Sequence, residues 1–275
     1  MMVLHYGFHN DRICPISEMS IGPNNLSLHR GYGIFDYFTY HNRSNIHLDW
    51  YLDRFYSSAG KAHLSIEKSR EDLIDIINKL YDLNRTPESN FKLILSGGNS
   101  TNGYSPSNEL ELLVLNYRHR HHPTNYYTHG ISLITHRHVR PFADIKSTNY
   151  MIPYLLKSKL EDSEAVDVLY VMEGIVSETS RANIFCCKHG ILYTPSRDIL
   201  PGITRRMLMS DQTSYPVVER NISLDELMAS DEVFITSSTK KVMPVVRIDG
   251  QPIKGGGVGP IATELNKWLT THTSC

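Results

Sequence analysis

The sequence predicts an α+β protein of two domains, an N-terminal α/β domain and a C-terminal β-rich domain with peripheral helices. Three observations lead to this fold class. The chain has 275 residues and 40% hydrophobic content, enough for two modest domains that each bury a core. Two amphipathic helical patterns occur in its first third. A polar stretch that ends in a proline, at 118–123, then separates them from a series of short strand patterns.

The N-terminal domain is expected to span residues 1–118 and to combine two helices with strands. Apolar residues recur at helical spacing over residues 48–62. A second helix is predicted over 71–81, where Ser69 and Asp72 resemble a capping box. Segments 91–95 and 110–117 have strand patterns and flank a loop rich in Gly, Asn and Ser.

Residues 119–128 are expected to link the two domains. The histidines at the start of this linker are potential metal ligands, but the sequence has no acidic or cysteine residue close to them. We therefore expect a solvated connector and no metal site.

The C-terminal domain is expected to span residues 129–275 and to be rich in strands. The strand patterns lie at 131–135, 168–172, 183–187 and 232–236. Helices are predicted after Asn149, Ile203 and Ser223 and at 261–269. A cleft between two such domains is a common location for a cofactor.

Composition excludes several classes of partner. The formal charge is −1, from 28 basic and 29 acidic residues, which gives no electrostatic footprint for nucleic acid or an anionic membrane. No window approaches the roughly 18 apolar residues of a membrane helix, and the start of the chain has no signal-peptide pattern. The four cysteines form no disulfide or metal pattern, so a reducing cytoplasm is the expected location.

Four features have an ordinary structural explanation when each is considered alone. Lys146 precedes a predicted helix, where lysines are normally solvated. Glu178 has the setting of a turn or edge-strand carboxylate. Arg54 lies beside the apolar stripe of its helix, where an arginine usually extends to solvent. Residues 201–204 are a plain helix-entry signal.

Taken in order, however, six segments between about residue 22 and residue 255 resemble the class IV (fold type IV) aminotransferases. This family includes branched-chain aminotransferases, D-amino acid aminotransferases and aminodeoxychorismate lyases. The segments are 52–59 (LDRFYSSA), 145–150 (IKSTNY), 174–185 (GIVSETSRANIF), 190–195 (GILYTP), 202–205 (GITR) and 236–239 (TSST), the last leading to Met243-Pro244. The resemblance implies a homodimer of chains with an α/β two-layer sandwich and a C-terminal pseudo-barrel that carries the lysine. It also implies pyridoxal 5′-phosphate, bound between the two domains.

The resemblance further implies catalytic and ring-binding roles. Lys146 matches the lysine that forms a Schiff base with pyridoxal phosphate and later moves the α-proton. Glu178 matches the carboxylate that pairs with the pyridine nitrogen, so that the ring acts as an electron sink. Tyr150 matches a tyrosine near the cofactor O3′ in branched-chain enzymes. At the same position, D-amino acid enzymes have a Leu and lyases have an Arg.

Four further residues match the phosphate-binding positions of the family. Arg54 matches the phosphate-binding arginine, and a planar guanidinium suits a phosphate. Ile203 and Thr204 match the residues that offer backbone amides, and in Thr204 also a hydroxyl, at a helix start. Ser238 matches a further hydroxyl on the phosphate side.

The substrate-binding pattern departs from all three groups. The loop 95–106 resembles the lyase version, but Gly97 and Asn102 stand where lyases usually carry arginines. The arginine and histidine with which D-amino acid enzymes bind the α-carboxylate are also missing. The tyrosine-x-arginine pattern of branched-chain enzymes is not evident, and Phe91 and Leu93 are its nearest equivalents.

Other residues are candidates for the substrate pocket. Arg30 occurs where relatives have an aromatic residue of that pocket, and Lys240 follows the turn that approaches the substrate carboxylate in relatives. The expected substrate residues are therefore Arg30, Phe35, Thr239 and Lys240. We predict that the Arg30 guanidinium binds a substrate carboxylate. The alternative is a structural arginine that hydrogen-bonds the interdomain loop.

These features predict a transaminase with ping-pong kinetics. Branched-chain amino acids with 2-oxoglutarate are the expected substrates. The first alternative is an aminodeoxychorismate lyase that releases pyruvate and 4-aminobenzoate. A remoter alternative is a non-catalytic family member that acts as a binding protein.

Overall fold

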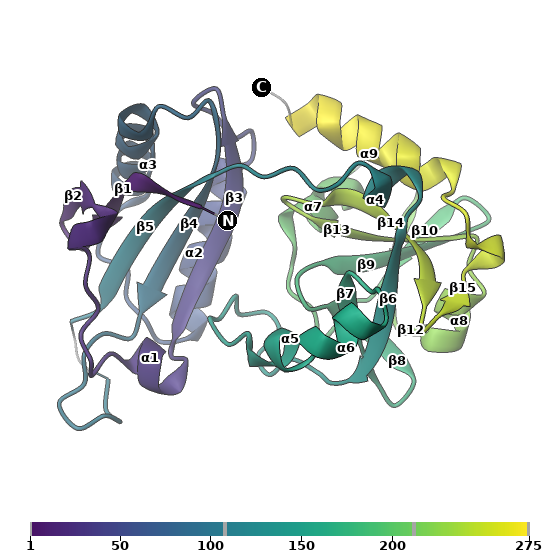
Figure 1. Cartoon of the computed structure of the whole chain (residues 1–275), viewed down its shortest axis with the longest axis horizontal. Coiled ribbons are helices and arrows are strands. Elements are labelled where there is room, and N and C mark those ends of the chain that lie inside the picture. The colour runs from purple at the N-terminus through teal and green to yellow at the C-terminus, as the bar shows by residue number, and fades with distance from the viewer. Residues whose placement is uncertain (1, 107–108, 211–212, 274–275) are drawn as a thin grey trace. The chain divides into compact units, whose positions relative to one another are not determined.

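The computed structural model describes residues 2–106, 109–210 and 213–273. The chain divides into two compact units, drawn with all elements in Figure 1. Unit 1 contains the chain up to Arg120 together with Ile145–Asn149, and unit 2 contains His121–Asp144 and the chain from Tyr150 onward. The lysine segment, which the sequence assigns to the C-terminal domain, therefore groups by its contacts with unit 1.

Unit 1 has two layers, a five-stranded antiparallel sheet with two long helices on one face. The strand order is β2-β1-β5-β4-β3. The strands are β1 Val3–His9, β2 Arg12–Pro15, β3 Gly33–His41, β4 Glu88–Ser96 and β5 Glu111–Arg118. The helices are η1 Ile16–Glu18, α1 Leu26–Arg30, α2 Leu48–Lys61 and α3 Arg70–Asn84.

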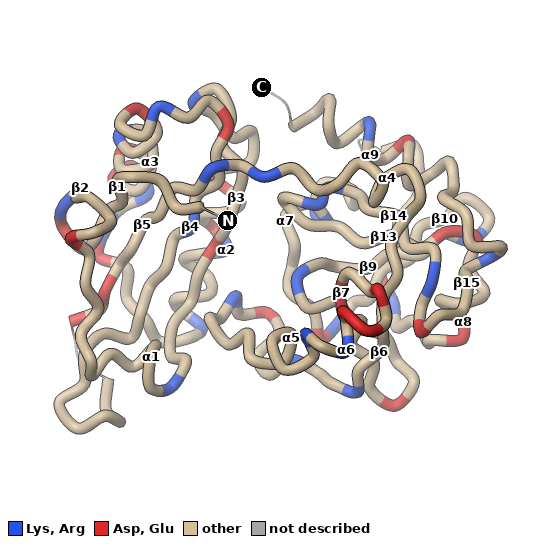
Figure 2. The backbone as a smooth tube through the Cα atoms, viewed as in Figure 1, with Lys and Arg blue, Asp and Glu red and all other residues tan. Residues whose placement is uncertain are grey.

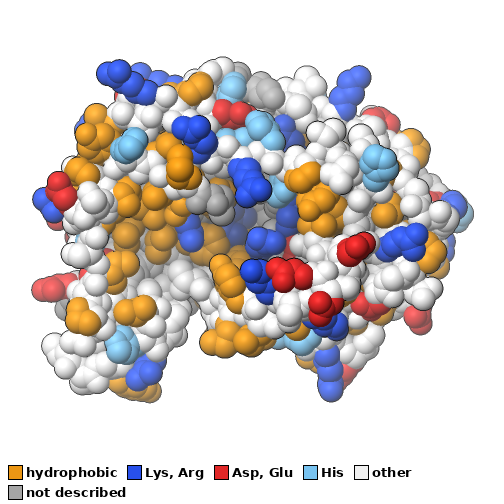
Figure 3. All heavy atoms as spheres, viewed as in Figure 1, with side chains coloured by type: hydrophobic (Ala, Val, Ile, Leu, Met, Phe, Trp, Pro, Cys, Tyr) orange, Lys and Arg blue, Asp and Glu red, His pale blue; other side chains and the backbone are white. Residues whose placement is uncertain are grey.

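Alternation along β3 decides which side chains face the helices of unit 1. Phe38 lies against Tyr51 of α2 with ring centroids 5.3 Å apart, and Tyr40 lies against Tyr81 of α3 at 5.5 Å. Even-numbered residues of β3 therefore point toward α2 and α3, and odd-numbered residues point to the opposite face. Figure 3 shows hydrophobic side chains gathered over this opposite face.

Unit 2 is a β-barrel with peripheral helices, which confirms the predicted β-rich architecture. Nine strands of its ten-stranded sheet have the order β11-β10-β9-β13-β14-β6-β7-β8-β12, and the tenth, β15, pairs with β14. An additional β9–β8 pairing closes a ring. The strands are β6 Ile131–Arg137, β7 Asp167–Met172, β8 Ile175–Thr179, β9 Asn183–Lys188, β10 Ile191–Thr194, β11 Val217–Glu219, β12 Ile222–Ser223, β13 Glu232–Ser237, β14 Lys241–Ile248 and β15 Gln251–Pro252. Fully buried aliphatic side chains such as Leu133, Ile184 and Ile235 fill the core of the barrel.

The helices of unit 2 lie around the barrel. They are α4 Asn125–Thr128, α5 Met151–Leu155, α6 Lys157–Asp162, α7 Ile203–Met209, α8 Leu224–Met228, η2 Lys254–Gly256 and α9 Pro260–Thr273. The predicted linker thus contains a short helix, and the helix predicted after Asn149 is two short ones that meet at Leu156. The other predicted helices are confirmed. Helix α3 extends past both predicted ends, and its capping box explains why it begins at Arg70.

Basic and acidic residues both occur along the backbone of each unit (Figure 2). Among the described residues, no helix is long and apolar enough to cross a membrane. Cys14, Cys186 and Cys187 are buried free thiols.

Candidate active site

Lys146 is fixed in unit 1 by backbone contacts to β3 and α2. Its carbonyl accepts a hydrogen bond from the Phe35 amide at 2.8 Å, and its own amide donates to Ser58 Oγ at 3.1 Å. The side chain is half-buried, and its ammonium nitrogen lies 4.8 Å from the centre of the Phe35 ring. The solvated setting that local sequence favours for Lys146 is therefore wrong.

Arg54 forms a buried bidentate ion pair in the same unit. Its Nε and Nη2 donate to the Asp36 carboxylate at 2.8 and 2.7 Å, and the two side chains are 7% and 0% exposed. Two parallel hydrogen bonds fix the plane of the guanidinium. Ser58, which contacts the Lys146 backbone, lies one turn further along α2 on the same face. Helix α2 therefore connects two of the predicted site residues, Arg54 and Lys146.

Glu178 is the residue before the last of β8 in unit 2, and it is buried. Arg140 Nε donates to its Oε1 at 3.0 Å, and the Leu200 amide donates to its Oε2 at 2.9 Å. An ionised carboxylate accepts hydrogen bonds and donates none, so these donors orient both oxygens. Glu178 is therefore not the ordinary turn or edge-strand carboxylate that its local sequence favours.

The turn that follows Leu200 leads directly into α7 and brings Ile203 and Thr204 near Glu178 in the same unit. Asn183 Nδ2 donates to the Leu200 carbonyl at 2.8 Å and so holds this turn. A Cβ on Gly202 would come 2.0 Å from Asn183 Oδ1, which explains the glycine. The first amides of α7 have no acceptor within the helix, so they point toward its N-terminal end. Ile203 and Thr204 are both buried.

Lys240 lies in a buried ion pair at the end of the turn between β13 and β14. Its Nζ is 2.8 Å from Asp167 Oδ2, and the side chains are 5% and 1% exposed. Burial alone would raise the pKa of Asp167, but the Lys240 ammonium and the Arg181 guanidinium outweigh it and hold that pKa below its usual value. Ser238 and Thr239 are half-buried in the preceding turn.

The remaining predicted residues have different settings. Tyr150 is half-buried directly before α5. Phe35 lies on the face of β3 opposite the helices, beside Lys146. Arg30 is exposed at the end of α1, and its Nη1 donates to the His29 carbonyl at 3.4 Å. Among the described residues, Arg30 forms no hydrogen bond or ion pair with the other candidates of unit 1.

Several residues that support the candidates were not found from sequence. Asp36 could have been found from the sequence, because it is the one acidic residue at a buried position of the alternating strand β3. Ser58 had a weaker signal, since it follows Arg54 by one helical turn. No sequence signal indicates Arg140 or Asp167. Their partners, Glu178 and Lys240, lie 38 and 73 residues away in the chain.

The linker histidines have an acidic neighbour after all. The His119 amide is 3.4 Å from the Glu88 carbonyl, so His119 extends the β4–β5 pairing opposite Glu88. Its Nδ1 lies 3.1 Å from Asn90 Oδ1.

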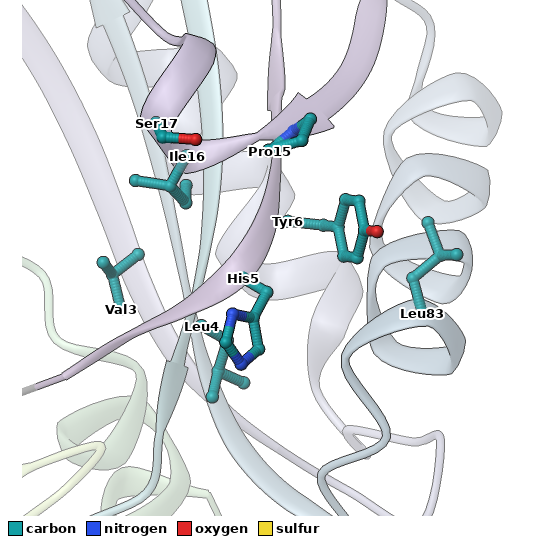
Figure 4. Close-up of a pocket in the computed structure, with 8 residues that line it drawn as sticks. All are labelled: Val3, Leu4, His5, Tyr6, Pro15, Ile16, Ser17 and Leu83. Carbon is teal, nitrogen blue, oxygen red and sulfur yellow. The ribbon is translucent and has the colours of Figure 1, made fainter.

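A groove of about 590 Å³ opens beside β1 and β2 of unit 1 (Figure 4). Tyr6, Leu83 and Pro15 line it together with neighbouring residues of β1. It contains none of the predicted site residues, and its open, mixed lining offers no cluster of catalytic groups.

Comparisons with known proteins bear on these candidates. A family model described as amino-transferase class IV matches residues 33–248. D-alanine aminotransferase from Staphylococcus aureus is 28% identical, over 97% of this chain and 98% of the relative. A T.th. branched-chain amino acid aminotransferase complexed with N-(5′-phosphopyridoxyl)-L-glutamate has a TM-score of 0.87 and 25% identity, with 98% and 94% of the two chains covered. A Legionella pneumophila protein assigned as a 4-amino-4-deoxychorismate lyase has a TM-score of 0.83 and 25% identity, with coverage of 93% and 96%.

Proposed function

Because the chain belongs to the class IV aminotransferase family, we propose that it is a transaminase that binds pyridoxal 5′-phosphate through Lys146. It exchanges an amino group between a small amino acid and a 2-oxo acid in two half-reactions. The observation that carries the proposal is the setting of Lys146, whose backbone is tied to β3 and α2 and whose amine is half-buried beside an aromatic ring.

The residues of each unit fit the groups of this cofactor. In unit 2, Glu178 is a buried carboxylate with oriented oxygens, suited to a protonated pyridine nitrogen. The N-terminal amides of α7 at Ile203 and Thr204 suit a phosphate, as does the Ser238 hydroxyl. In unit 1, the Asp36 pair gives Arg54 one fixed orientation, which supports a role in phosphate binding.

The chemistry divides between the cofactor and the chain. When bound, pyridoxal phosphate supplies an electron sink that stabilises negative charge on the substrate carbon. Lys146 Nζ would take the proton from that carbon and hold it for return during the same half-reaction. Glu178 would keep the ring nitrogen protonated, and Tyr150 would donate a hydrogen bond to an oxygen on the ring. Arg140 holds Glu178 in position for this role.

Two donor classes have separate support. Tyr150 favours a branched-chain amino acid with 2-oxoglutarate as acceptor, because it matches the tyrosine of branched-chain enzymes. The full-length match to a D-alanine aminotransferase favours D-alanine. A panel of L- and D-amino acids separates the two, since each class requires one enantiomer.

The lyase reaction is the second candidate function. The loop at 103–106 and the similarity to the Legionella protein favour it, whereas the missing arginines at Gly97 and Asn102 oppose it. A lyase needs no 2-oxo acid for turnover, so omitting the acceptor from the assay distinguishes the two reactions.

We also propose a homodimer in a reducing cytoplasm, with an interdomain boundary at the linker. Three buried free thiols agree with a reducing location. Sedimentation of the purified protein tests the oligomeric state.

The test of the proposed function is an absorbance spectrum of the protein with pyridoxal phosphate. We expect a visible band that is absent from Lys146→Ala and is bleached by one enantiomer of a small amino acid. Lys157→Ala is the matched control, because that side chain is 72% exposed and should leave the band unchanged. A band that Lys146→Ala retains would contradict the proposal.

A further inference from the structure

Lys240 is bonded at three of its atoms, and all three contacts lie within unit 2. Its amide donates to Ser237 Oγ at 3.2 Å, and its carbonyl accepts a hydrogen bond from the Tyr127 hydroxyl at 3.2 Å. Its ammonium donates to Asp167 Oδ2 at 2.8 Å. The turn residue Ser238 lies between Ser237 and Lys240 in the chain, so the contacts of Lys240 hold the turn that carries the Ser238 hydroxyl.

The turn needs such an anchor because its backbone is strained at the next residue. Lys241 has a φ of 52°, in the left-handed region that disfavours residues with a Cβ. A conformation of this kind persists where the surrounding contacts hold it. The buried contact between Lys240 and the first residue of β7 supplies one of these contacts.

The other end of the ion pair meets the turn that follows Glu178. Asp167 accepts hydrogen bonds from the hydroxyls of Thr179 and Ser180, the two residues directly after Glu178. The Ser180 amide also donates to the Val168 carbonyl at 3.0 Å, which ties this turn to β7 a second time. A continuous set of buried polar contacts therefore joins the turn between β13 and β14 to the segment that carries the proposed partner of the ring nitrogen.

Stability alone does not explain a lysine at this position. The side chains of Lys240 and Asp167 are 5% and 1% exposed, so both charges are removed from water. The attraction within a buried ion pair often only offsets the cost of this desolvation. The pair does fix geometry, because a displaced turn would leave a buried charge without its partner. The turn is thereby limited to positions from which Lys240 reaches Asp167.

We propose that Lys240 is a positioning residue for the cofactor phosphate, because it anchors the turn that carries Ser238 to Asp167. The proposal rests on the binding of pyridoxal 5′-phosphate proposed above. The anchored turn presents the Ser238 hydroxyl in one orientation, and the same pair fixes where this hydroxyl lies relative to Glu178. Since its ammonium is directed at Asp167, Lys240 acts through the turn and not as a cation that binds the substrate.

The test compares two forms of the cofactor that differ in the phosphate. Pyridoxal lacks this group, so the ratio of its dissociation constant to that of pyridoxal 5′-phosphate measures phosphate recognition. Both constants come from titrations of the full chain, followed by the visible absorbance band. We expect Lys240→Met to weaken the binding of pyridoxal phosphate by about tenfold, the scale of a hydrogen bond to a charged group, and to leave pyridoxal nearly unchanged.

The double variant Lys240→Met/Asp167→Asn separates positioning from a folding defect. It removes the anchor without leaving a buried carboxylate charge, so its unfolding midpoint in urea should recover toward that of the wild type while the loss of phosphate recognition persists. Lys241→Met is the matched control in the same turn, because Lys241 contacts Thr270 and should change neither constant. Recovery of phosphate recognition in the double variant would overturn the proposal.

A second comparison tests the route through Ser238. Adding Lys240→Met to Ser238→Ala should cost much less than tenfold, because the two residues act on the same contact. Fully additive losses would overturn the proposed route. An equal loss for both forms of the cofactor, or no loss for pyridoxal phosphate, would overturn the role of Lys240, while the band of the wild type still supports the transaminase. A wild-type protein without a band would overturn both.

Discussion

The buried ion pair of Arg54 with Asp36 in unit 1 and that of Lys240 with Asp167 in unit 2 each hold a candidate residue. They differ in how much of the carboxylate's environment one side chain supplies. In unit 1, Asp36 receives three hydrogen bonds from described residues, two from Arg54 at 2.8 and 2.7 Å and one from the Tyr37 amide at 2.7 Å. Without Arg54, this fully buried carboxylate would keep one donor.

In unit 2, Asp167 is bound by groups from several parts of the barrel. Lys240 Nζ donates at 2.8 Å and the Val168 amide at 2.9 Å. The hydroxyls of Thr179 and Ser180 also donate to it. Asp167 therefore keeps three described donors when Lys240 is removed. The comparison teaches that equal burial does not mean equal dependence on the cation, and that Asp36 relies on Arg54 much more than Asp167 relies on Lys240.

The largest effect is expected for Arg54→Met. Breaking a buried ion pair by removing one partner costs about 3–5 kcal/mol, because an uncompensated charge remains. Urea unfolding of the protein without cofactor measures this free energy. Arg70→Met is the control, since Arg70 pairs with Asp53 at an exposed position and should cost at most about 1 kcal/mol. Similar losses in both variants would break the comparison.

A smaller loss, about 1–3 kcal/mol, is expected for Lys240→Met. The remaining hydroxyl and amide donors satisfy most of the Asp167 carboxylate, which limits the penalty. The neighbouring Lys241 contacts Thr270 at 3.2 Å in an exposed setting, so Lys241→Met should change the free energy of unfolding by about 0.5 kcal/mol or less. If Lys240→Met cost more than Arg54→Met, the reasoning from donor number would be wrong.

The smallest effect is a pH dependence specific to unit 2. The depressed pKa of Asp167 contributes stability that is present above the unfolded value of about 3.9 and is lost as the pH falls through the folded value. Unfolding midpoints from pH 7 to pH 3 should therefore fall more steeply for the wild type than for Asp167→Asn. Parallel curves for the two proteins would show that Asp167 contributes no such stability.

Local signals account for what the sequence could predict of the fold. The apolar stripe of α2 and the Ser69–Asp72 capping box of α3 depend on neighbouring residues, and both predictions are confirmed. The barrel could be anticipated from its strand-rich composition and the family resemblance. Its closure also needs pairings between distant segments, such as Leu133 of β6 with Ile248 of β14, which spacing does not reveal.

The candidate site shows the same limit. The identity of Lys146, Glu178 and Arg54 as candidates came from ordered motifs, whose roles remain proposals. The contacts that hold these residues in place join distant segments of the chain, such as Lys146 and Ser58, which are 88 residues apart.

The central claim is that Lys146 is the lysine that carries the cofactor. Reduction of the protein with sodium borohydride in the presence of pyridoxal phosphate, followed by peptide mass spectrometry, identifies that lysine directly. We predict a phosphopyridoxyl group on Lys146 and an unmodified Lys240. Modification of Lys240 in place of Lys146, or of neither lysine, would contradict the account.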